Sequence, residues 1–258
     1  MRKTGIHFWL IGLMVTFFAC KDDDGGTDDP MTVDSVQLYH DQGVGASAND
    51  LLASSTYDRL TIEFIYVDGY SLNDATINNI KSFLANRLHK PGGITVSETI
   101  ISSPGLAPYS VGDLDSVEEN YRASFINGST EAVYVFVTDG SYSKSENVLG
   151  VAYRNTSLAL FGNRIQDLSG GLGQPSKTLL ETTVIEHEFG HIMGLVNVGT
   201  PMQSDHQDEE NGKHCDVENC LMYYAVETGD IVSNLASSGS VPELDAQCLA
   251  DLQANGGK

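Results

Sequence analysis

The spacing of apolar positions switches along the chain between two periods, and these switches predict strands alternating with helices. Residues 59–67 (RLTIEFIYV) are rich in β-branched and aromatic side chains and predict a strand. Apolar residues recur every three or four positions between residues 73 and 90, which predicts a helix that ends before a proline. Residues 94–101 alternate polar and apolar side chains and predict a half-buried strand. The first part of the chain is therefore predicted to form a β-α-β unit.

The middle of the chain continues this alternation. Residues 113–125 predict a short acidic helix, and the continuous apolar run 132–137 (AVYVFV) predicts a central strand covered on both faces. Residues 148–161 predict one or two strands, and residues 33–39 give a weaker strand signal near the start. Strands that alternate with helices in this way predict an α+β fold, in which helices pack on a twisted mixed β-sheet.

The last third of the chain combines two predicted helices with a long polar segment. Residues 175–194 and 242–255 have helical periodicity, whereas residues 197–213 are polar and rich in turn-forming types, which predicts a loop. We place a boundary near residue 195, between a larger N-terminal subdomain with the sheet and a small C-terminal subdomain. Both belong to one predicted domain, residues 31–258.

Residues 1–19 have the features of an export signal. Two basic residues precede an apolar stretch too short to span a bilayer, and a small residue stands directly before Cys20. This end resembles the lipobox of bacterial lipoproteins, in which the cysteine is lipidated; a plain secretory signal is the alternative. Residues 20–30 are acidic and glycine-rich, and resemble the flexible tether of surface lipoproteins in Bacteroidetes-type bacteria. We therefore expect an exported protein anchored to the outer membrane, on its periplasmic or cell-surface face.

The charge balance and the cysteines narrow the possible partners. The 258 residues include 14 basic and 35 acidic side chains, a net charge of −21, which argues against a nucleic-acid partner. No basic amphipathic helix is evident, so we expect membrane contact only through the N-terminal lipid, and a monomer.

Apart from Cys20, three cysteines remain, Cys215, Cys220 and Cys248. An odd number in an exported protein indicates one disulfide with a free thiol, or a shared metal site.

The strongest chemical signal lies in the predicted helix 175–194. His187 and His191 are four residues apart, so on a helix both imidazoles lie on one face and can bind one metal ion. Glu188 projects beside them, where a general base for a zinc-activated water is needed. This H-E-x-x-H pattern predicts a catalytic zinc site. Three protein ligands and an open position are required for such a site, so a third ligand must come from elsewhere in the chain.

Two segments resemble known zinc peptidases. From His187 to Gly194 the chain reads H-E-x-x-H-x-x-G, which resembles the first part of the metzincin signature, where the glycine turns the chain toward a third histidine. Asn197 stands at the place of that histidine. Further on, residues 214–222 read H-C-x4-C-x-M, which is similar to the archaemetzincin pattern of third ligand, cysteine pair and Met-turn, displaced here by an insertion. The resemblance implies a metzincin-like zincin fold and a zinc metallopeptidase acting within protein or peptide substrates.

The resemblance also implies roles for two residues after the cysteine pair. Met222 would lie in a tight turn beneath the zinc as an apolar floor. The Met-x-Tyr sequence that it begins resembles that of astacins and serralysins, in which the tyrosine hydroxyl approaches the zinc, so Tyr224 becomes a candidate for binding the oxyanion. An ordinary packed aromatic is the alternative for Tyr224.

The sequence leaves the third ligand open between His214 and His206. His214 has the H-C-x4-C-x-M context. Alternatively, His214 joins the three cysteines in a second, structural zinc site, and His206 completes the catalytic one. A glutamate further along the chain is disfavoured as a ligand because Gly194 would interrupt the long helix that such sites need. The rival to an enzyme is an exported binding lipoprotein whose zinc is structural or lost; retention of Glu188 argues against it.

Overall fold

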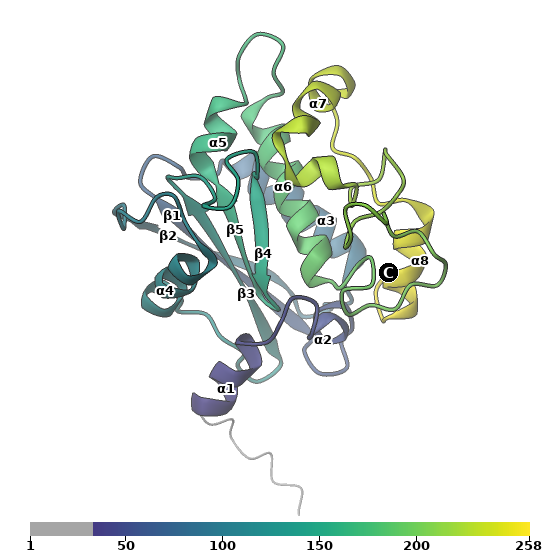
Figure 1. Ribbon diagram of the computed structural model, residues 1–258. Helices are drawn as coiled ribbons and strands as arrows, with labels where there is room; N and C mark the ends of the chain where they lie inside the picture. Colours follow the sequence, from purple (N-terminus) through teal and green to yellow (C-terminus); the bar gives the residue numbers. More distant parts are fainter. Residues whose placement is uncertain (1–32) are drawn as a thin grey trace, which may run out of the picture. The chain divides into compact units, whose positions relative to one another are not determined.

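A five-stranded mixed sheet organises the computed structural model, which describes residues 33–258 (Figure 1). The strand order is β2-β1-β3-β5-β4; β1 is parallel to β2 and β3, β5 is parallel to β3, and β4 is antiparallel to β5. The strands are β1 (Arg59–Val67), β2 (Gly93–Ile101), β3 (Thr130–Thr138), β4 (Gly150–Arg154) and β5 (Ser157–Phe161). The predicted signal in residues 1–19, Cys20 and the tether 20–30 lie outside the described residues.

Helices cover both faces of the sheet and continue beyond it. They are α1 (Val33–His40), α2 (Ala48–Leu52), α3 (Asp74–Arg87), α4 (Val111–Tyr121), α5 (Gly162–Asp167), α6 (Lys177–Ile192), α7 (Val232–Ser238) and α8 (Ala246–Ala254), with the 3-10 turns η1 (Tyr224–Glu227) and η2 (Gly229–Ile231). The predicted α+β class and mixed sheet are confirmed. No helix in residues 33–258 is long and apolar enough to cross a bilayer.

The core is divided by the central strands, whose side chains alternate between the two faces. Val133 and Val135 of β3 join the main core beneath α3 and α6, whereas Tyr134 and Phe136 face the smaller core beneath α4. Every residue of β3 after the first is buried, which confirms the central strand predicted from its continuous apolar run.

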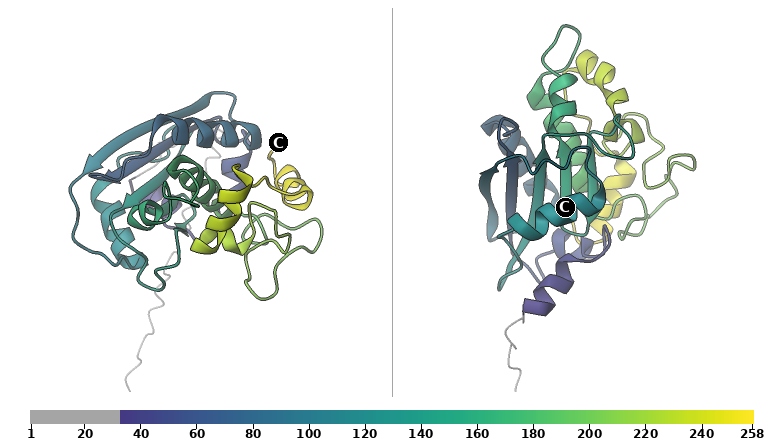
Figure 2. Two further views of the ribbon diagram at one scale, coloured as in Figure 1. Left: turned by 90° about the horizontal axis from the view of Figure 1, so that it is seen from above. Right: turned by 60° about the vertical axis from the view of Figure 1, so that its left-hand side comes forward.

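The chain after residue 195 lies on the far side of α6 from the sheet, as the green-to-yellow segments in Figures 1 and 2 show. Its apolar residues, among them Met222 and Leu252, belong to the same main core as β1, β3 and α6. This segment therefore has no separate core, and α6 is packed from both sides. A helix in that position can be apolar around its whole circumference.

Several predicted elements differ from those observed. Residues 33–39 were predicted as a strand, but they form α1; its last residue, His40, is buried and its Nδ1 lies 2.7 Å from Thr156 Oγ1, so tertiary contacts hold the segment in place of strand pairing. The pattern did not predict α5 or α7, which are only one or two turns long. The last helix begins at Ala246, where the Asp245 side chain accepts a hydrogen bond from the Cys248 amide.

Candidate metal centre

Helix α6 carries the first two candidate ligands through the interior. Ser176 caps its first turn by accepting a hydrogen bond from the Leu179 amide at 3.1 Å, and every residue from Leu180 to Ile192 is buried. The chain leaves the helix through Gly194, whose φ of +78° favours glycine. A Cβ there would lie 2.6 Å from the Thr200 amide nitrogen. Asn197, at the place of the third histidine in the metzincin signature, is exposed in this turn.

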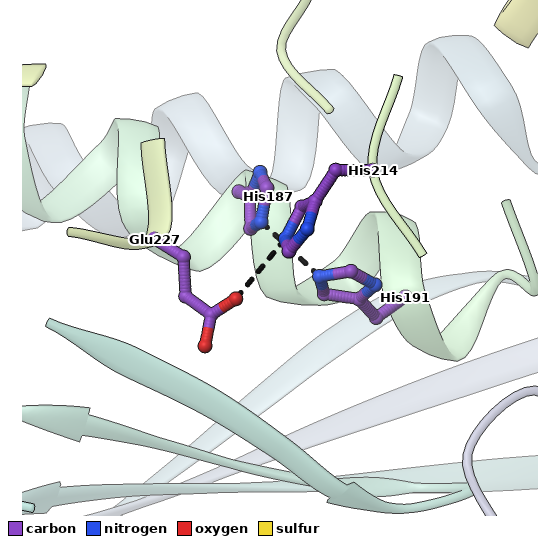
Figure 3. A group of neighbouring side chains, drawn as sticks. All are labelled: His187, His191, His214 and Glu227. Carbon is purple, nitrogen blue, oxygen red and sulfur yellow. Dashed lines mark hydrogen bonds and ion pairs between the residues drawn. The ribbon is translucent and has the colours of Figure 1, made fainter. Parts of the chain in front are cut away.

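Three histidines converge on one point, as Figure 3 shows for the side chains of His187, His191 and His214. The Nε2 atoms of His187 and His191 are 3.1 Å apart, and the ring of His214 lies 5.3 Å and 5.1 Å from their rings. Two ligands on a tetrahedral zinc ion are separated by about 3.3 Å, given Zn–N bonds of about 2.0–2.1 Å. The spacing of the two helix histidines therefore fits a bound metal ion.

Backbone carbonyls orient two of these imidazoles. The Nδ1 atom of His187 lies 2.7 Å from the Leu221 carbonyl oxygen, and Nδ1 of His214 lies 3.1 Å from that of Asn211. Because a carbonyl only accepts, each Nδ1 carries the proton; Nε2 of His187 thus presents its lone pair to the shared point, and Nε2 of His214 faces the Glu227 carboxylate at 3.0 Å. Burial, with a smaller contribution from His214, lowers the pKa of His187 to about 4. Burial also holds the pKa of His191 well below its usual range, so both rings are neutral at pH 7, as metal binding requires.

Glu188 lies beside this group and is held by the edge strand β4. Its Oε2 accepts a hydrogen bond from the Ala152 amide at 2.7 Å, whereas its Oε1 is buried with no protein partner in the described chain. Gly150 leaves room for the carboxylate, since a Cβ there would lie 2.7 Å from Oε1. Burial and then the negative charge of Glu227 raise the pKa of Glu188 well above its usual range. One oxygen of a strongly basic carboxylate is thus free to accept a proton.

Glu227 is a member of the group that the sequence analysis did not predict. Its Oε2 lies 3.0 Å from Nε2 of His214, and its carboxylate lies within 4.8 Å of the ligand atoms of all three histidines (Figure 3). Burial opposes the ionisation of Glu227, but the hydrogen bond with His214 and the nearby imidazoles outweigh it and lower its pKa. A single glutamate in η1 has no spacing motif, so only the tertiary contact identifies it.

Met222 lies directly against the metal helix, whereas Tyr224 makes no hydrogen bond with the group within residues 33–258. Met222 is fully buried, and a Cβ on Gly190 of α6 would lie 2.2 Å from its sulfur. Tyr224 packs its ring on that of Tyr223 with centroids 4.7 Å apart. Within residues 33–258 no hydrogen bond joins Tyr224 to the histidines or to Glu188. The oxyanion-binding role of Tyr224 therefore stays a prediction from the sequence.

A second cluster forms where the C-terminal segment packs under α8, and it contains His206 rather than His214. His206 Nδ1 lies 3.4 Å from Cys215 Sγ and 4.0 Å from Cys248 Sγ. The arrangement in which His214 joins the cysteines and His206 joins the helix histidines is therefore not the one in the structure. The side chain of His206 is held at the cysteines because its Nε2 pairs with the buried Asp251 carboxylate at 2.8 Å. His214, and not His206, therefore lies beside the two helix histidines.

The thiols of this second cluster are free. Cys220 Sγ and Cys248 Sγ are 3.6 Å apart, well beyond the disulfide bond length of about 2.05 Å. Hydrogen bonds from Cys215 and Cys248 lower the pKa of the Cys220 thiol below its usual range. Sulfur and imidazole donors gathered in this way fit a zinc ion, with Asp251 orienting the imidazole.

The fold is similar to that of a solved archaemetzincin structure, although no family model matches the sequence. The archaemetzincin from Methanopyrus kandleri superposes with a TM-score of 0.52 at 15% sequence identity, covering 77% of this chain and 96% of that one. The metalloproteinase-II from Bacteroides fragilis gives a TM-score of 0.43 at 17% identity, covering 79% of this chain and 54% of that one. The similarity to the archaemetzincin supports the predicted fold, a mixed sheet with packed helices, at the level of the fold alone.

Proposed function

We propose that this protein is a zinc-dependent endopeptidase. One observation carries the proposal: the Nε2 atoms of three histidines converge beside an unpaired carboxylate oxygen of Glu188, on a fold similar to that of an archaemetzincin. His187, His191 and His214 would hold the metal. A zinc ion there would supply a Lewis acid that polarises a peptide carbonyl and makes water more acidic.

The chain's own groups supply the proton transfers. The Ala152 amide fixes Glu188 Oε2, which leaves Oε1 as the atom that accepts a proton from the attacking water. The raised pKa of Glu188 makes it a stronger base than an exposed carboxylate. The same oxygen would then carry the proton to the departing amine nitrogen, which leaves Glu188 ionised for the next cycle.

The neighbouring edge of the sheet suits a polypeptide substrate. Strand β4 is the last strand in the sheet order, and its residue Ala152 contacts Glu188. An edge strand presents unpaired backbone groups to which an extended peptide can bind. A peptide bound in this way would pass close to the carboxylate.

We propose in addition a second, structural metal ion in the group of His206, Cys215, Asp245 and Cys248, whose possible ligand atoms lie within 4.8 Å of one another. His206, Cys215 and Cys248 are buried and Asp245 is partly buried, and a set of four protein ligands is typical of structural zinc. The protein would act as a monomer at the outer membrane, tethered through a lipid on Cys20, as the N-terminal sequence predicts.

The test compares the purified protein with Glu188→Ala and Glu188→Gln. Zinc should remain at the histidine site in all three proteins because Glu188 is not a ligand, while hydrolysis of casein should fall by orders of magnitude in both variants. Equal hydrolysis by the variants would refute the role of Glu188. Metal bound by the wild type without hydrolysis of any polypeptide would favour the rival function, an exported binding lipoprotein.

A further inference from the structure

The carboxylate of Glu227 is the one polar side chain of the histidine group that the proposed mechanism leaves without a role. We propose that Glu227 is a fourth, displaceable protein ligand of the metal held by His187, His191 and His214, and that it closes the site until another ligand replaces it. The inference rests on the proposed function for the metal at the three histidines and for the identity of that replacement, a peptide substrate.

The position of the carboxylate supports ligation. Glu227 Oε2 lies 3.0 Å from His214 Nε2, close to the 3.1 Å between the Nε2 atoms of His187 and His191. Both distances are those expected between neighbouring ligands on one zinc ion, and carboxylate oxygens bind zinc at about 2.0–2.2 Å. His214 already satisfies its Nδ1 at the Asn211 carbonyl, so its Nε2 is the atom that faces both the metal position and Glu227.

The backbone holds Glu227 in place from two directions. Glu227 is the last residue of η1, which follows the Met222 turn directly. Its backbone carbonyl oxygen accepts a hydrogen bond from the Leu149 amide at 2.8 Å. The next residue, Thr228, forms an antiparallel bridge with Val148. The segment leading into β4 therefore fixes the Cα of Glu227, and only the side chain is left to move.

Glu227 lies on the side of the histidine group that faces solvent. His187 is fully buried and His191 is 7% exposed, while the side chain of His214 is 11% exposed and that of Glu227 is 25% exposed. Of these four side chains, Glu227 is therefore the one most open to a molecule that arrives from solvent. The partial exposure also gives this carboxylate space to swing away without disturbing the core.

Four protein ligands have a functional consequence. Structural zinc sites are closed by four protein ligands, whereas catalytic sites keep one position open. With Glu227 bound, the resting site would resemble a structural zinc site. Displacement of Glu227 would open one position, as in a catalytic zinc site. The ring of Tyr224, the candidate for binding the oxyanion, packs on that of Tyr223.

The experiment uses the full-length chain loaded with Co(II), whose visible spectrum reports a change of ligand, and imidazole as a neutral probe of the fourth position. Neutral imidazole avoids the repulsion that an anionic probe would meet near Glu227. The variants are Glu227→Gln, which keeps the side-chain volume, and Glu227→Ala. Glu146→Gln is the matched control, since it removes the same charge from an exposed position near the same segment.

We expect imidazole to bind at least about tenfold more tightly to both Glu227 variants than to the wild type and to Glu146→Gln, and Co(II) affinity to fall at least about tenfold in Glu227→Ala. Equal imidazole affinity in the wild type and the variants would overturn the inference while leaving the proposed peptidase untouched. The expected spectra without hydrolysis in any protein would instead refute the peptidase and leave Glu227 a ligand. Failure of the wild type to bind Co(II) would overturn both.

Discussion

Replacement of Gly190 by alanine tests how the metal helix and the Met222 turn fit together. A Cβ at residue 190 would lie 2.2 Å from the Met222 sulfur and 3.1 Å from its terminal carbon. Ordinary contacts begin near 3.5–4.0 Å, so the sulfur must move by about 1.5 Å. Met222 is fully buried, and overpacking of this kind typically costs about 1–3 kcal/mol.

Two effects oppose each other in Gly190→Ala, and their magnitudes decide the sign. Alanine in a helix interior is favoured over glycine by about 1 kcal/mol, which offsets part of the overpacking. We expect a net loss of up to about 2 kcal/mol in the free energy of unfolding, measured by urea denaturation. The control is Gly112→Ala in α4, where the nearest atom to a Cβ is Ser110 Oγ at 3.8 Å, so stability should rise by up to about 1 kcal/mol.

The effect of Gly190→Ala should extend to the metal. The Met222 carbonyl accepts a hydrogen bond at 2.8 Å from the amide of Cys215, the residue after His214, so a shift of the turn moves the third ligand. Zinc affinity should fall about tenfold. Adding Met222→Ala removes the clash, so the double variant should be more stable than the two single changes predict, by at least about 1 kcal/mol. A Gly190→Ala protein as stable as Gly112→Ala, with unchanged zinc affinity, would refute this packing.

The remaining predictions concern the two metal sites, a buried carboxylate and the anchor. His214→Ala should lose the catalytic metal and lower hydrolysis by orders of magnitude, whereas His206→Ala should lose only a second metal, assayed under reducing conditions; the reverse pattern would exchange their roles. Burial raises the pKa of Glu131 from 4.5 to about 7, so the folded state binds this proton more tightly and the stability contribution of Glu131 falls as pH rises between those values. The free energy of unfolding of Glu131→Gln, measured relative to the wild type by denaturation, should be roughly 3 kcal/mol higher at pH 8 than at pH 5. An equal difference between the two proteins at both pH values would contradict the raised pKa of Glu131. Cys20→Ser should release the protein from membranes or block its maturation; a native protein that is already soluble would rule out the lipid anchor.

The local sequence was sufficient to predict those features whose residues all lie within one helix or strand. The periods of β1, α3 and β3 predicted these elements because side-chain burial on a strand or helix repeats within a few residues. The same reasoning placed His187, Glu188 and His191 together, since four residues make about one helical turn. It failed for α1, where contacts from His40 to a distant strand end outweigh the local pattern of the segment.

Only the tertiary structure decided which side chains from the loop segments lie at each candidate metal site. His206 and His214 both lie in or near the polar segment after α6, and their sequence context left two arrangements open. Asp251 of α8 pairs with His206, while the carbonyls of Asn211 and Leu221 orient His214 and His187 toward each other. Glu227 has no motif at all, because its place beside His214 comes from the pairing of its segment with the start of β4. Contacts between residues far apart in the chain bring these side chains together, and no local period encodes such contacts.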